Sequence, residues 1–241
     1  MDAGGASLEV LDGDDVLRTM QVGGDAGVNE VLWDFRVDPA FDAEGGGGGF
    51  SRGPPPGAGP RVLPGTYTVR LTVAGESQTT DVGVRLDPRR EASRAALVSR
   101  QDAMLRAHAL AGPARDARER IGAMNDRLAE IRALVDDAEM EDADRERIET
   151  IAEAISGQLE EIGDDLGDVA GGAGIGQMEG WSGEPTADQM YRIGLAWEAL
   201  PEVAERINAL LARRMPRLEA LLGDLGVMPD LGDPIRIPPR R

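Results

Sequence analysis

The spacing of apolar residues changes once along this chain, near residue 88, and that change limits the possible folds more than any other feature. Residues 66–73 (Thr-Tyr-Thr-Val-Arg-Leu-Thr-Val) alternate polar and apolar side chains without a fault, which is the period of a half-buried β-strand. After residue 88 the apolar residues recur every three or four positions, as in an amphipathic helix. The sequence therefore predicts a segregated α+β protein, with strands first and helices after them.

Five antiparallel strands are predicted in the first third of the chain. They are Leu8–Leu11, Val16–Met20, 28–37, 66–73 and the run from Val82 to Leu86. The first two flank Asp12-Gly13-Asp14-Asp15, which has the residue types of a hairpin turn. Strands of this number and spacing predict a small Ig-like β-sandwich over residues 1–88. Because only seven residues precede Leu8, we expect the sandwich to lack its first strand.

A glycine- and proline-rich segment at 38–60 interrupts the predicted strands. It contains the five consecutive glycines Gly45–Gly49 and the triplet Pro54-Pro55-Pro56. A segment with so few apolar side chains cannot bury enough surface to offset the entropy of ordering it. We therefore expect a disordered loop that contributes no site.

Three helical stretches are predicted after residue 88, at about 91–136, 142–169 and 187–223. The second has the clearest apolar stripe: Ile148, Ile151, Ile155, Leu159, Ile162, Leu166 and Val169. Pro113 predicts a kink or a break in the first stretch, and Pro201 and Pro216 predict kinks in the third. Short connections between long helices predict an elongated, kinked, antiparallel three-helix bundle over 89–228, followed by a C-terminal tail at 229–241.

Composition excludes several classes of chemistry. The chain has no cysteine and no lysine, and its single histidine is His108, so thiolate metal sites, cysteine nucleophiles, Schiff-base lysines and multi-histidine sites are all excluded. The formal net charge of −18 repels nucleic-acid phosphates, so no nucleic-acid partner is expected. No apolar run approaches the roughly 18 residues of a membrane span, so no membrane insertion is expected either.

The motifs that invite a functional interpretation have simpler explanations. Gly171–Gly176 follows a helix rather than a strand, so it predicts a flexible loop and not a phosphate-binding loop. His108 lies near Met104 and Leu105 on a helix face, which favours a packed or boundary histidine. The carboxylate pairs Asp136–Asp137, Glu160–Glu161 and Asp164–Asp165 fall on solvent faces of helices. The sequence thus predicts no catalytic, cofactor-binding or metal-binding residues, no cofactor and no enzyme activity.

Two stretches resemble a known family. The first stretch resembles the Ig-like module of the flagellar hook-capping type. It consists of three segments: Leu8-Glu-Val-Leu-Asp-Gly-Asp-Asp-Val-Leu-Arg-Thr-Met, Gly27-Val-Asn-Glu-Val-Leu-Trp-Asp-Phe-Arg and Leu63-Pro-Gly-Thr-Tyr-Thr-Val-Arg-Leu-Thr-Val. The second stretch is similar to the helical tail that follows this Ig-like module. It consists of Gly183-Glu-Pro-Thr-Ala-Asp-Gln and Met215-Pro-Arg-Leu-Glu-Ala-Leu-Leu. Together they resemble the C-terminal region of bacterial secreted sortilin-like or BNR-repeat β-propeller proteins, often labelled glycosyl hydrolase.

The resemblance implies that substrate chemistry belongs to a propeller, whose Ser-x-Asp-x-Gly-x-x-Trp turns do not occur in this sequence. It further implies an extracellular or periplasmic parent, although this chain has no signal peptide, and a natural start upstream of Met1. The expected partner is the parent's β-propeller or a cell-surface protein. The leading hypothesis is a non-catalytic structural or protein-interaction region. Two alternatives remain open: an accessory part of a glycoside-hydrolase-like propeller that shapes its site, and a coiled-coil oligomeriser, which would need a second apolar stripe.

Overall fold

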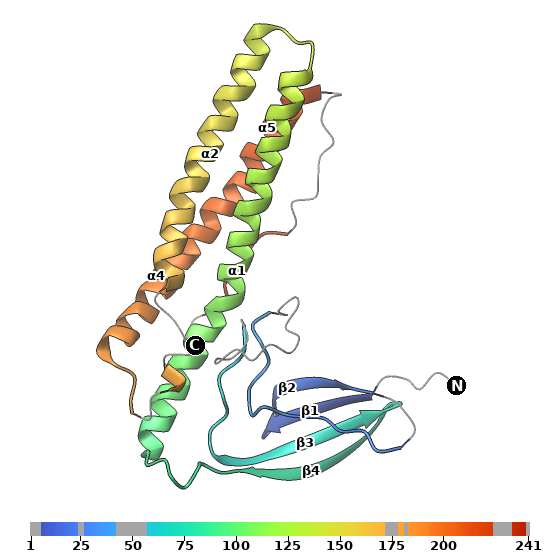
Figure 1. Ribbon diagram of the computed structural model, residues 1–241, viewed down its shortest axis with the longest axis vertical. Coiled ribbons are helices and arrows are strands. Elements are labelled where there is room, and N and C mark those ends of the chain that lie inside the picture. The colour runs from blue at the N-terminus through green and yellow to red at the C-terminus, as the bar shows by residue number, and fades with distance from the viewer. Residues whose placement is uncertain are drawn as a thin grey trace. The chain divides into compact units, whose positions relative to one another are not determined.

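The computed structural model describes residues 6–23, 27–41, 57–171, 178–180, 183–223 and 233–239, and it is an α+β fold (Figure 1). The chain divides into two compact units. One contains the described residues of 1–108 and 174–186, and the other those of 109–173 and 187–241. The boundary between the units lies after His108, inside a helix. It does not lie at residue 88, where the spacing of apolar residues changes.

Four antiparallel strands form one sheet in the first unit. They are β1 (Ala6–Asp12), β2 (Asp15–Val22), β3 (Gly65–Val73) and β4 (Glu76–Val84), in the order β2-β1-β3-β4. The register sets Leu8 opposite Leu71 and Val10 opposite Val69, while Glu9 lies opposite Arg70 on the other face. In β1 and β3 the alternation of the sequence therefore becomes an apolar face and a polar face. The predicted bounds of the fourth strand are wrong: β4 begins at Glu76 and ends at Val84, so Leu86 lies outside it.

The fifth predicted strand, at 28–37, is wrong. This segment contains only an isolated bridge between Arg36 and Arg61, and Phe35 has a φ of 60°. A non-glycine residue in the left-handed region turns the chain out of an extended path. Within the described part of the chain the strands make a single sheet, so a five-stranded β-sandwich is not observed.

The predicted disorder at 38–60 is wrong for the two ends of that segment. Asp38 N–H donates to the Leu17 carbonyl at 2.7 Å, and Ala40 N–H donates to the Gly57 carbonyl at 2.8 Å. Gly59 and Pro60 are buried. Hydrogen bonds to other segments thus hold 38–41 and 57–60 in place, and residues 42–56, including Gly45–Gly49, lie outside the described residues.

Helices make up the rest of the described chain. They are α1 (Arg94–Asp137), α2 (Asp142–Gly171), α4 (Ala187–Ala209), the π-helix η1 (Leu210–Arg214) and α5 (Met215–Leu222). Their bounds agree with the three predicted stretches to within a few residues. α1 runs through Pro113 without interruption, so the break considered at that residue does not occur.

The apolar stripes form the core of the helical unit. In α2, Ile148, Ile155, Leu159, Ile162 and Leu166 are each at most 2% exposed. The three- and four-residue spacing of apolar residues in the first predicted stretch includes Ile131 and Leu134, which predicts that Leu134 is buried. That prediction is wrong: Leu134 is 37% exposed, whereas Val135 is 1% exposed. The step from Ile131 to Val135 is four residues, so Val135 and not Leu134 returns to the buried face.

The π-helical turn before Pro216 has a cause in the sequence. Buried residues of the third stretch recur at Ile207 and Leu210, but the next one is Met215, five positions on. A π-turn accommodates one extra residue, and Met215 N–H donates to the carbonyl of Leu210. Pro216 has no N–H and would crowd the carbonyl four residues before it. The wider turn therefore keeps α5 facing the core.

Part of the predicted C-terminal tail is attached to this helical unit. Ile235 is 7% exposed, its N–H donates to the Asn208 side chain at 2.8 Å, and its carbonyl accepts from that side chain at 3.0 Å. In the described part of the chain, no helix has the length and apolar character that a membrane span needs.

Candidate functional site: a buried arginine cluster

Arg36 is the most buried charged residue of the first unit, at 6% exposed. Three contacts position its backbone. The Trp33 indole N–H donates to the Arg36 carbonyl at 2.9 Å, Val62 N–H donates to the Phe35 carbonyl at 2.7 Å, and Val37 N–H donates to the Pro60 carbonyl at 3.1 Å. The left-handed Phe35 directs the arginine side chain inward.

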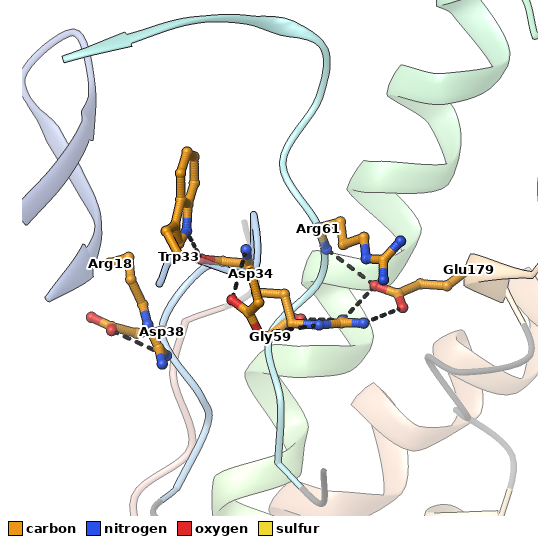
Figure 2. Close-up of polar contacts among 8 residues, drawn as sticks. Arg18, Trp33, Asp34, Asp38, Gly59, Arg61 and Glu179 are labelled. Carbon is orange, nitrogen blue, oxygen red and sulfur yellow. Dashed lines mark hydrogen bonds and ion pairs between the residues drawn. The ribbon is translucent and has the colours of Figure 1, made fainter. Parts of the chain in front are cut away.

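The Arg36 guanidinium binds the carboxylate of Glu179 in two parallel bonds, of 2.7 and 2.8 Å (Figure 2). It also donates to the Gly59 carbonyl at 2.8 Å, and Asp34 lies 3.6 Å from its Nε. The Glu179 side chain is 13% exposed and accepts a further bond from Arg61 N–H at 3.1 Å. A two-bonded arginine–carboxylate pair is among the strongest polar contacts in proteins.

Gly59 is required where it stands, because a Cβ on this residue would lie 2.5 Å from both Cγ2 and the carbonyl oxygen of Val37. The Gly59 backbone therefore lies against the 27–41 segment, and this places its carbonyl where Arg36 reaches it. Only a residue without a side chain permits this approach.

Asp38 joins three segments beside this cluster. Its carboxylate accepts from Thr19 N–H at 3.0 Å and lies 3.7 Å from Arg18 (Figure 2). Its carbonyl accepts from Nε2–H of His108 at 2.9 Å. The result is a link between β2, the 27–41 segment and the first turns of α1.

His108 is a half-buried residue, as its position on the helix face indicated. A carbonyl only accepts, so Nε2 carries the proton, and the buried Nδ1 has no hydrogen-bond partner among the described residues. Burial lowers the pKa of His108, while the carbonyl and charge of Asp38 act weakly in the opposite direction. The imidazole is consequently neutral near pH 7.

A second buried ion pair lies in the helical unit. Arg127 of α1 donates to both oxygens of Glu219 of α5, at 2.6 and 2.7 Å, and to Glu130 at 2.8 Å. Arg127 and Glu219 are 7% and 6% exposed. The hydrogen bonds to Glu219 raise the pKa of Arg127 further above its ordinary value. This pair connects the first and last helices of the unit.

The other candidate residues from the sequence do not lie together in one site. Asp136, Asp137, Glu160, Glu161, Asp164 and Asp165 are exposed on their helices, where Glu161 and Asp165 pair with Arg206. Residues 172–177, which include most of the glycine-rich run, lie outside the described residues. Among the residues that the structure describes, no three carboxylate or imidazole side chains are grouped so that they could hold a metal ion.

The Arg36 cluster was missed at the level of sequence. Arg36 and Glu179 are 143 residues apart, and neither belongs to a periodic pattern. Arg36 stands in a segment that also contains Glu30 and Asp34, so nothing in the local sequence distinguishes it from an exposed charge. No protein-family model, curated protein or solved structure gives a significant match to this chain.

Proposed function

We propose that this chain is the non-catalytic C-terminal structural and protein-interaction region of a secreted β-propeller protein. The Arg36–Glu179 and Arg127–Glu219 pairs support the structural, non-catalytic part of this proposal, and the sequence resemblance supports the propeller part. These deeply buried charged groups are engaged by carboxylates and carbonyls of the same chain. Each guanidinium connects chain segments that are distant in sequence. Its role in this proposal is therefore to stabilise the fold and not to take part in a reaction.

The sheet is, in this proposal, an Ig-like module. The Tyr67 hydroxyl donates to the Leu63 carbonyl, four residues upstream, at 2.7 Å. Such a bond at the start of a strand resembles the tyrosine corner of Ig-like sandwiches. Trp33 packs edge-on against Tyr67 and Phe35, with ring centroids 5.8 and 5.3 Å apart. A kinked three-helix bundle follows the module in the same proposal.

The proposed partner is the propeller of the parent protein or a protein of the cell surface, outside the cell or in the periplasm. The net charge of −18 favours a partner with a basic patch, because electrostatic complementarity accelerates association and disfavours acidic competitors. Nucleic acid is disfavoured as a partner for the same reason.

Sequence, binding and activity measurements test the proposal. The genomic sequence upstream of Met1 should encode a propeller in frame, and isothermal titration calorimetry should detect binding between that propeller and this chain. The purified chain should not hydrolyse glycoside or peptide substrates. Turnover by the chain alone, abolished by His108→Gln, would replace the proposal with an enzyme. An increase in the propeller's kcat/KM on adding the chain would favour the accessory role instead.

A further inference from the structure

α4 has a second stripe, on the side away from the core. Its buried face contains Ile193, Trp197, Leu200 and Ile207. Tyr191 and Leu195, one turn apart on another face, are 65% and 45% exposed. The stripe continues past Ala199 and Glu202 toward Arg206 and Arg213, and residues of α2 border the hollows along it.

Charge is divided along this stripe. Its N-terminal half contains the ion pair of Asp188 with Arg192. It also contains Glu198 and Glu202, for which no ion pair is present within the described residues, so the excess charge of this half is negative. Its C-terminal half contains Arg213 and Arg214, in the π-helical turn. Arg206, between the halves, is engaged by Glu161 and Asp165 of α2. An acidic half and a basic half thus share one helical surface.

We propose that this surface binds a second copy of the same chain, with α4 and η1 of one copy antiparallel to those of the other. A two-fold axis beside Arg206 and Ile207 places Glu198 and Glu202 of each copy near Arg213 and Arg214 of the partner copy. Such an interface is self-complementary, as two-fold dimers require. From Tyr191 to Arg213 the stripe is roughly 33 Å long, at about 1.5 Å per residue.

The apolar residues of the stripe fit this arrangement. Tyr191 and Leu195 would lie against α5 of the partner copy, where the exposed Ala220 leaves room between the helices. Tyr191 and Leu195 supply the apolar part of this interface, and the charged residues supply the rest. The dimer goes beyond the proposed function, since it forms whether or not the chain also binds a propeller.

The net charge of −18 on each copy opposes association at long range. At about 0.15 M salt, charges farther apart than about 8 Å are largely screened, while contacting side chains are screened less. The dimer is therefore measured at that ionic strength, by sedimentation velocity and light scattering over a wide range of concentrations of the full chain.

Charge reversal provides the test. Glu198→Arg with Glu202→Arg makes both halves basic, and Arg213→Glu with Arg214→Glu makes both halves acidic. Each double variant should weaken self-association by about tenfold or more, because like charges then face each other. An equimolar mixture of the two should recover association as a heterodimer, since every basic half then meets an acidic half. Recovery also shows that both variants are folded.

The matched control is Glu149→Arg with Glu153→Arg, two exposed α2 residues at the same four-residue spacing, which should leave association unchanged. Tyr191→Ser with Leu195→Ser should weaken it. The inference is overturned if the native chain stays monomeric throughout, if the charge reversals leave the dimer intact, or if two folded reversal variants fail to associate when mixed. Binding to the propeller is assayed separately, so either idea can fail alone.

Discussion

Arg127 and Glu219 show, at the scale of single residues, how a buried pair differs from a surface pair. Both are almost completely buried, whereas Glu130, the other carboxylate on Arg127, has a side chain that is 64% exposed. Removing one partner of a buried pair leaves a charge without compensation, but replacing both with apolar residues is often neutral or stabilising.

Glu219→Gln should therefore lower the free energy of unfolding by about 3–5 kcal/mol. Arg127→Met combined with Glu219→Leu should recover most of that loss, and Glu130→Gln should cost less than about 1 kcal/mol. Urea denaturation followed by circular dichroism measures all three. Equal losses for Glu219→Gln and Glu130→Gln would mean that burial does not set the strength of this pair.

His108 makes stability depend on pH. Its folded pKa lies below the ordinary value of about 6.5, so the unfolded chain binds the proton more tightly. The stabilisation by neutral His108 is complete above about pH 7 and is lost as pH falls through about 6.5. Glutamine can still donate an N–H to the Asp38 carbonyl, but it does not titrate.

We expect His108→Gln to have a flatter dependence of unfolding free energy on pH between about pH 7 and pH 5, above the range where most carboxylates titrate. Chemical denaturation at a series of pH values, for both proteins in parallel, provides the comparison. Identical slopes would show that His108 does not contribute to acid sensitivity.

At the scale of elements, the π-helical turn compensates for one extra residue between Leu210 and Met215. Deleting Ala212, an exposed residue of that turn, restores a four-residue step. The buried faces of α4 and α5 then stay aligned, although Pro216 still crowds the carbonyl of the preceding turn. Deleting Glu205, which is equally exposed, shifts every later core residue by about 100°.

The Ala212 deletion should keep a cooperative thermal unfolding transition, and the Glu205 deletion should lose it. Circular dichroism melting curves compare the two proteins directly, since each is one residue shorter than the native chain. If both deletions unfolded alike, the π-turn would not be what keeps α5 in phase with the core.

At the scale of the whole molecule, the chain divides into two compact units, each with buried apolar residues of its own. Ile155 of α2 is completely buried in the helical unit, and Ile155→Ala should cost about 2–5 kcal/mol through lost contacts and a residual cavity. Leu134→Ala, at a 37% exposed site, is the matched control and should cost much less.

Hydrogen exchange shows which of the two units the Ile155→Ala substitution destabilises. In Ile155→Ala the amides of α2, α4 and α5 should exchange faster, while those of β1–β4 keep their protection, because units with separate cores open separately. Equal loss of protection in the strands would mean that the two units unfold as one.

Local periodicity, which the sequence alone contains, determined the α+β class, the strands β1, β2 and β3, part of β4, the helical bounds and most of the α2 stripe. These features depend on side chains two to four residues apart, so a single segment specifies them. The single-residue error at Leu134 and Val135 arose because neighbouring apolar residues satisfy the same approximate period.

Only the tertiary structure decided the rest. Residues 28–37 have a strand-like composition, but Phe35 adopts a left-handed conformation there, and hydrogen bonds from Val62 and to Pro60 hold the segment in that shape. Arg36 meets Glu179 across 143 residues, and Arg127 meets Glu219 across 92. The partner of a buried charge depends on which segments the fold brings together, and no local pattern of residues encodes that choice.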